Sequence, residues 1–257
     1  MSETAIHELS VDGVGPVQVT VTERGEGAPV LILHGGGGPL TVGAFADLVA
    51  ARRRLRVVTP THPGFAGTHR PEKLNDIGRL AATYVELLAE MDLSHVTVLG
   101  NSIGGWIASE MVLLDASRIG ALVLVDGVGI EVPGHPVADF FSLTPRQVAE
   151  LSYCDPDRFG IDPAKLPPEA LQAMAGNRAT LAVYAGKGMS DATLVQRLAD
   201  VPTPTKVIWG ECDRIVDPDF GRAFAAAIPN ARFQLLTSAG HLPQIETPEE
   251  LLDAIWP

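Results

Sequence analysis

Short apolar runs, rich in valine, isoleucine and leucine, recur along the chain and alternate with longer stretches in which apolar residues repeat every three to four positions. The short runs are typical of parallel strands covered on both faces, and the longer stretches are typical of amphipathic helices. Their alternation predicts an α/β protein with a doubly wound, mostly parallel sheet. The expected strands are residues 30–33, 56–59, 96–99, 121–125, 206–209 and 233–236, and the expected helices are residues 41–52, 74–91, 103–115, 218–227 and 248–255.

Two parts of the chain depart from this alternation. Residues 7–22 alternate apolar and polar positions around Asp12-Gly13 and Gly15-Pro16, which predicts a short hairpin. Between residues 131 and 198, prolines punctuate short helical segments and no strand of comparable quality occurs. We interpret residues 131–198 as a helical cap inserted into a core made of residues 1–130 and 199–257. Such a cap would lie over the carboxyl ends of the strands, where open α/β sheets bind ligands.

A serine stands at the junction of a predicted strand and a predicted helix. Ser102 is the centre of Gly100-Asn101-Ser102-Ile103-Gly104, directly after the apolar run that ends at Leu99. In a Gly-x-Ser-x-Gly turn the glycines leave room for a sharp bend that lifts the hydroxyl clear of the sheet edge. Ser102 is therefore the candidate nucleophile. The alternative is a plain strand-to-helix turn whose serine caps the helix.

Later strands are followed by a candidate acid and a candidate base. Asp213 comes just after the strand expected at 206–209, and His241 comes just after the strand expected at 233–236. Histidine can take a hydroxyl proton near neutral pH, and a carboxylate bonded to its Nδ1–H fixes the tautomer. Serine, acid and histidine in this chain order are typical of one hydrolase fold. Asp126 competes with Asp213, because it also ends a predicted strand.

A run of four glycines follows the first predicted parallel strand. Residues Gly35 to Gly38 can bring main-chain N–H groups close to a substrate oxygen. We expect the N–H groups of Gly36 and Ile103 to form an oxyanion hole. A phosphate-binding loop is the alternative, but no Gly-Lys-Ser/Thr follows and Pro39 contributes no donor.

Taken together, these motifs resemble the α/β-hydrolase fold, in particular its serine esterases and carbon–carbon bond hydrolases. The resemblance implies a triad of Ser102, Asp213 and His241, with Asp213 preferred over Asp126 as the acid. The matching motifs are His34-Gly35-Gly36-Gly37-Gly38, Thr61-His62-Pro63-Gly64-Phe65, Gly100-Asn101-Ser102-Ile103-Gly104-Gly105, Gly210-Glu211-Cys212-Asp213 and Gly240-His241.

Four further residues are candidates for contact with the substrate: Gly37, Phe140, Arg178 and Leu242. Arg178 lies in a helical stretch of the expected cap, where an arginine facing the pocket could clamp a substrate carboxylate. An ordinary solvated charge or a cap-to-core ion pair is the alternative for this residue. Leu242 follows His241 at the position where the carbon–carbon bond hydrolases characteristically carry tryptophan.

Three functions are compatible with these residues. The first is hydrolysis of a small carboxylic ester through an acyl-enzyme on Ser102. The second is cleavage of a carbon–carbon bond in a vinylogous diketone acid of the meta-cleavage type, or of a lactone, by the same residues. The departure at Leu242 weighs against carbon–carbon cleavage. The third, from another class, is a non-catalytic receptor for a small ligand on the same fold.

Composition narrows the range of partners and compartments. A formal net charge of −12 argues against nucleic acid and anionic membranes as partners. The chain opens with no secretory pattern, and its two cysteines, Cys154 and Cys212, lack metal-type spacing, which favours a reduced, cytoplasmic protein in which Cys212 packs as a small apolar residue. We expect no metal and no cofactor, a small-molecule substrate, and a monomer or homodimer.

Overall fold

The computed structural model describes residues 2–257, which form an eight-stranded sheet with helices on both faces. The strand order is β1-β2-β4-β3-β5-β6-β7-β8, antiparallel between β1, β2 and β4 and parallel from β4 to β8. The predicted fold class is confirmed. The strands are β1 (Ser2–Val11), β2 (Gly15–Arg24), β3 (Ala28–Leu33), β4 (Leu55–Thr61), β5 (Val96–Asn101), β6 (Ile119–Val125), β7 (Thr205–Gly210) and β8 (Arg232–Leu236).

Alternate residues of each central strand face opposite sides of the sheet, as the two-residue repeat of a strand requires. Leu31 and Leu33 of β3 belong to one hydrophobic cluster, and Val30 and Ile32 belong to another. Both sets are buried, which explains why these strands read as unbroken apolar runs in the sequence.

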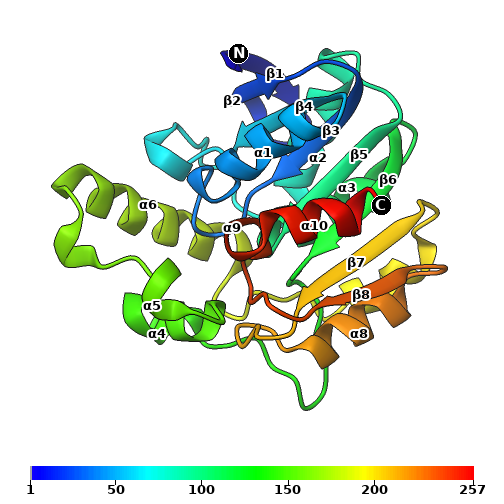
Figure 1. Ribbon diagram of the computed structural model, residues 1–257. Coiled ribbons are helices and arrows are strands. Elements are labelled where there is room, and N and C mark those ends of the chain that lie inside the picture. The colour runs from blue at the N-terminus through cyan, green and yellow to red at the C-terminus, as the bar shows by residue number, and fades with distance from the viewer. Residues whose placement is uncertain (1) are drawn as a thin grey trace.

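Helices pack over both clusters. Helices α2 (Ile77–Glu90), α3 (Ile103–Leu114) and α8 (Pro218–Ala227) cover one face of the sheet. Helices α1 (Leu40–Arg52), α9 (Pro243–Glu246) and α10 (Pro248–Ile255) cover or border the other. Figure 1 shows α1 and α10 crossing in front of the sheet. All five helices expected from the sequence are present.

The segment between β6 and β7 is mainly helical. Three of its helices begin at a proline in the first turn, where the missing N–H costs nothing. In Figure 1, α4, α5 and α6 gather beyond one end of the sheet. The boundaries expected for a separate cap, residues 131 and 198, stay a prediction. The helices are α4 (Pro145–Ser152), α5 (Pro156–Phe159), α6 (Pro168–Ala185) and α7 (Leu194–Arg197), with 3-10 turns at Phe140–Ser142, Pro163–Lys165 and Leu198–Asp200.

The prediction of reduced cysteines is wrong. Cys154 and Cys212 form a disulfide between positions 58 residues apart in sequence, with Cα atoms 5.3 Å apart. Cys154 follows α4 and Cys212 follows β7, and both segments meet at the carboxyl edge of the sheet. Sequence spacing does not reveal this proximity, which arises from the path of the chain between β6 and β7. The cytoplasmic prediction loses the support that it took from the cysteines.

Within residues 2–257, no helix has both the length and the hydropathy to cross a bilayer.

Candidate active site

The candidate nucleophile lies in a tight turn between β5 and α3. Ser102 has φ 57° and ψ −120°, a conformation that a non-glycine residue adopts only under strain. The flanking glycines make the turn possible. A Cβ on Gly100 would come 2.0 Å from the Gly104 carbonyl oxygen, and a Cβ on Gly104 would come 2.3 Å from the Leu33 carbonyl oxygen. The Gly-x-Ser-x-Gly spacing is therefore a steric requirement of this turn.

The candidate base and acid form a buried pair. His241 Nδ1 lies 2.7 Å from Asp213 Oδ2, and the two side chains are 8% and 0% exposed. A carboxylate can only accept here, so Nδ1–H donates and Nε2 is left with its lone pair. The second oxygen of Asp213 accepts the N–H groups of Ile215 and Val216 at 2.8 and 3.1 Å. This pairing leaves His241 in the tautomer that general-base catalysis needs.

Asn101 ties the histidine loop to the serine turn. Its side-chain amide donates to the His241 carbonyl at 3.0 Å and to the Val125 carbonyl at 3.2 Å. Its Oδ1 accepts the amide of Gln244 at 3.0 Å. Ser102 and His241 are thus brought to the same edge of the sheet. Within residues 2–257, no hydrogen bond joins the Ser102 hydroxyl to the imidazole, so the transfer of a proton between them belongs to the proposal below.

The glycine run lies beside the serine. A Cβ on Gly35 would meet the Ser102 side chain at 3.1 Å, which places this loop against the nucleophile. Among residues 2–257, the N–H groups of Gly36 and Ile103 donate to no protein acceptor, while the neighbouring Gly38 N–H is used by the Gly35 carbonyl at 3.1 Å. Two unpaired donors beside the serine are what an oxyanion hole needs.

Two buried histidines hold the glycine run in place. His34 Nδ1 donates to the Gly35 carbonyl at 2.7 Å and its Nε2 accepts the His62 N–H at 3.1 Å, while His62 Nε2 donates to the His34 carbonyl at 2.8 Å. Tyr84 donates its hydroxyl proton to His62 Nδ1 at 2.5 Å. Burial lowers the pKa of His34 to about 4 and the pKa of His62 well below its ordinary value. Both rings are therefore neutral at physiological pH, as these hydrogen bonds require.

One face of α6 closes over the serine loops. Asn177 donates to the Gly37 carbonyl at 3.1 Å and accepts the Ala66 N–H at 2.8 Å. Thr180 donates to the Gly64 carbonyl at 2.9 Å. A Cβ on Gly36 would meet a methyl of Leu181 at 2.7 Å, so Leu181 lies directly on the glycine run. These contacts make α6 the wall of the site that faces the oxyanion donors.

The predicted substrate-contact residues are distributed around this wall. Gly37 is exposed at the tip of the glycine run, and Leu242 is half-buried directly after His241. Arg178 donates to the carbonyls of Phe140 and Leu143 at 2.7 and 3.2 Å, and its guanidinium stands 4.8 Å from the centre of the Phe140 ring. Arg178 and Phe140 therefore contact each other within the segment between β6 and β7. Their roles towards a substrate stay predictions.

Asp126, the competing acid, is also present at the site but does not pair with His241. It is fully buried after β6, and its Oδ1 accepts the Gly210 N–H at 2.8 Å. Asp126, Asp213 and His241 each offer a side-chain atom within 4.8 Å of the others, the spacing of a metal site. The direct bond between Asp213 and His241 accounts for two of the three groups without a cation.

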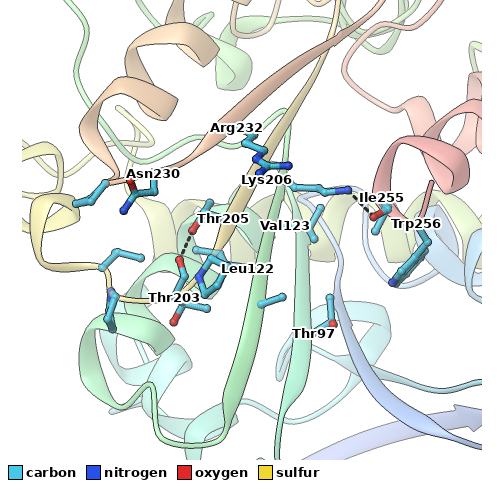
Figure 2. A pocket seen from close by; sticks show the side chains of 15 residues that line it. Thr97, Leu122, Val123, Thr203, Thr205, Lys206, Asn230, Arg232, Ile255 and Trp256 are labelled. Carbon is cyan, nitrogen blue, oxygen red and sulfur yellow. Dashed lines mark hydrogen bonds between the residues drawn. The ribbon is translucent and has the colours of Figure 1, made fainter.

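A separate cavity of about 600 Å³ lies at the opposite end of the strands. Figure 2 shows Thr97, Lys206 and Arg232 among its lining side chains. Thr97 is the second residue of β5 and Ser102 follows the last, a separation of roughly 16 Å along a strand. Lys206 donates from Nζ to the carbonyls of Ala254 and Ile255, and so anchors the end of α10. This cavity is not part of the candidate site.

Sequence reasoning missed three polar residues that position the histidine loop. They are Asn101, Gln244 and Glu246. Glu246 accepts the Gly240 N–H at 2.6 Å through one oxygen and the Cys154 N–H at 2.9 Å through the other. Asn101 stands inside the recognised motif, but nothing in its spacing points to residue 241. The other two resemble ordinary helix residues in the sequence.

Comparison with known proteins gives the family. Residues 30–254 match the alpha/beta hydrolase family, and the chain belongs to it. A 2-hydroxy-6-oxo-6-(2'-aminophenyl)hexa-2,4-dienoic acid hydrolase from Metapseudomonas resinovorans is 26% identical over 98% of this chain and 91% of its own length. A 2-hydroxymuconate semialdehyde hydrolase from Pseudomonas putida is 27% identical over 88% of this chain and 85% of its own length. The fold is also that of a thermophilic esterase from Thermogutta terrifontis, with a TM-score of 0.78, 22% identity and coverage of 98% and 96% of the two chains.

Proposed function

We propose that this protein is a serine hydrolase that cleaves a small carboxylic ester, with Ser102 as nucleophile, His241 as base and Asp213 as the acid that orients it. The observation that carries the proposal is the buried 2.7 Å hydrogen bond between Asp213 and His241. Asn101, the residue before Ser102, is hydrogen-bonded to the main chain of His241 and so holds the histidine loop near the serine. A buried pair of this kind leaves Nε2 as the basic atom of the site.

The reaction follows from the positions of these groups. The Ser102 oxygen attacks the acyl carbon as its proton passes to His241 Nε2, and the carbonyl electrons move onto the oxygen, which binds the N–H groups of Gly36 and Ile103. His241 then gives the proton to the leaving alkoxide and an acyl-enzyme remains. Water, deprotonated by His241, attacks the acyl carbon and releases the acid and the free serine.

The experiment is hydrolysis of p-nitrophenyl acetate by the wild type and by Ser102→Ala. We expect a burst of nitrophenol in the wild type and a loss of at least about 10³-fold in kcat for the variant. Ser109→Ala is the matched control, because Ser109 is also buried on α3 but bonds only to the Gly105 carbonyl. A serine-directed phosphonate should add its mass to Ser102. Labelling of another residue would mean that the nucleophile is wrong, and binding without turnover of any short ester would favour a receptor.

Carbon–carbon bond cleavage is the second candidate, because the two curated relatives described above are named as hydrolases of oxo-dienoic acids or of a muconate semialdehyde. Such substrates carry a carboxylate, and Arg178 is our candidate residue to bind it. The guanidinium of Arg178, however, already donates hydrogen bonds to two main-chain carbonyls. We therefore place ester hydrolysis first. Arg178→Gln should lower kcat/KM for neutral esters and for a 2-hydroxy-6-oxodienoic acid by the same factor. A loss of more than about tenfold confined to the acid would assign the carboxylate clamp to Arg178 and favour the second candidate.

A further inference from the structure

The mechanism above makes no use of Asp126, a buried carboxylic acid of the site. Asp126 has no solvent exposure and holds a positive φ of 47° at the end of β6. Its Oδ1 accepts the Gly210 N–H, but its Oδ2 is buried and has no hydrogen-bond partner within residues 2–257. A charged carboxylate oxygen in that situation would be strongly unfavourable.

The neighbours of Asp126 decide which carboxyl holds a charge. One side-chain atom from each of Asp126, Asp213 and His241 lies within 4.8 Å of the others, and two buried carboxylates this close do not ionise together. Asp213 accepts three N–H groups, from His241, Ile215 and Val216, whereas Asp126 accepts one. The negative charge therefore belongs on Asp213.

Electrostatics agree with this assignment. Burial, followed by the charge of Asp213, raises the pKa of Asp126 well above its usual range. The Gly210 N–H acts in the opposite direction, and the charge of Glu246 adds to the rise. Asp213, His241 and Glu246 are the charged or titratable groups that face Asp126 from the loops after β7 and β8 and from α9.

We propose that Asp126 is a positioning residue that keeps its proton and directs its Oδ2–H at Asp213, so that the triad acid is held by a carboxylic acid in addition to main-chain N–H groups. This proposal rests on the proposed function, because it acts through Asp213 and His241. A neutral Asp126 leaves the cluster with a single negative charge. A second negative charge, on Asp126, would favour the protonated imidazole of His241, which cannot act as a base.

The protonated carboxyl can be observed directly, without substrate. Infrared spectra of protein labelled with ¹³C at the aspartate carboxyls should show the carbonyl band of a protonated acid at pH 7. The band should vanish in Asp126→Asn and persist in Ser102→Ala. Asp219→Asn is the control: Asp219 is an exposed aspartate in the first turn of α8, so it carries the label, and its loss should leave the band unchanged. Absence of the band in the wild type would overturn the proposal.

Kinetics test the positioning role. Asparagine keeps both the acceptor for Gly210 and a donor towards Asp213. In Asp126→Asn, kcat should therefore stay within about threefold of the wild type, and the limbs of its pH profile should not move. Asp126→Ala removes the donor, so kcat should fall more than about tenfold at unchanged KM and the acidic limb of the profile should move to higher pH. Equal losses in the two variants would overturn the proposal. If Ser102→Ala keeps its turnover, the proposed function fails while the infrared band still reports on Asp126.

Discussion

The disulfide gives the sharpest prediction about stability. Cys154 and Cys212 close a loop of 58 residues, and in the chain-entropy description this restricts the unfolded chain by an amount equivalent to about 4 kcal/mol. That is a large part of the 5–15 kcal/mol that separates folded from unfolded proteins. We therefore expect reduction to lower the free energy of unfolding by about 4 kcal/mol.

The disulfide also lies next to the candidate site, but main-chain hydrogen bonds hold the same segments together. The His241 N–H donates to the Ser152 carbonyl at 2.7 Å, and the Arg214 N–H donates to the Leu151 carbonyl at 2.9 Å. These hydrogen bonds join the same segments and do not depend on the sulfur atoms. We therefore expect reduction to change stability far more than it changes ester turnover at 25 °C.

The assay is urea unfolding, followed by circular dichroism, with and without a phosphine reductant. The variant Cys154→Ala with Cys212→Ala is the control, and it should match the reduced wild type and ignore the reductant. Equal unfolding midpoints for oxidised and reduced wild type, after thiol titration has verified reduction, would refute the reasoning. Two free thiols in protein kept from reductants would refute the pairing itself.

Two further predictions concern the loops around Ser102. The pKa of His34 is about 4 in the folded protein, against 6.5 for an exposed histidine, so the stability present above pH 6.5 should fall by about 3 kcal/mol as the pH approaches 4. Urea unfolding at several pH values should show this slope, which should be flattened in His34→Gln and unchanged in His69→Gln, a change at an exposed ring. A wild-type slope equal to that of His34→Gln would contradict the prediction. Leu181→Ala should uncover Gly36 and so raise several-fold the ratio of kcat/KM for hexanoyl esters to kcat/KM for acetyl esters. Val183→Ala, on the exposed side of the same helix, should leave that ratio unchanged. Equal ratios in the two variants would show that Leu181 does not limit the length of the acyl chain.

The fold could be predicted because its signals are local. Burial of both faces makes β3 and the second half of β6 read as unbroken apolar runs, and a run of that kind keeps its meaning without knowledge of its neighbours. Part of the turn at Ser102 is equally local, since Gly100 is required by the carbonyl of Gly104, four residues later. Such features can be inferred from a short window of sequence.

The contacts that the sequence did not reveal connect positions far apart in the chain. The disulfide depends on where α4 ends, and the bond from Asn101 to the His241 carbonyl spans 140 residues. Glu246 reaches both Gly240 and Cys154 only because the short helix α9 lies beside the segment that follows α4. Each of these contacts is fixed by the route of a loop, and hydrophobic periodicity carries no information about loops.

The choice between Asp126 and Asp213 shows why the site needed coordinates. Each acid follows one of two neighbouring parallel strands, and the pairing of Val125 with Ile208 brings the ends of β6 and β7 together. The topology therefore places both carboxyls beside the same imidazole, and in the sequence only the resemblance to a known family preferred Asp213. Their difference lies in the number of N–H groups that each accepts, three against one. The acid with three donors can stay charged without solvent, and the other is left as its neutral neighbour.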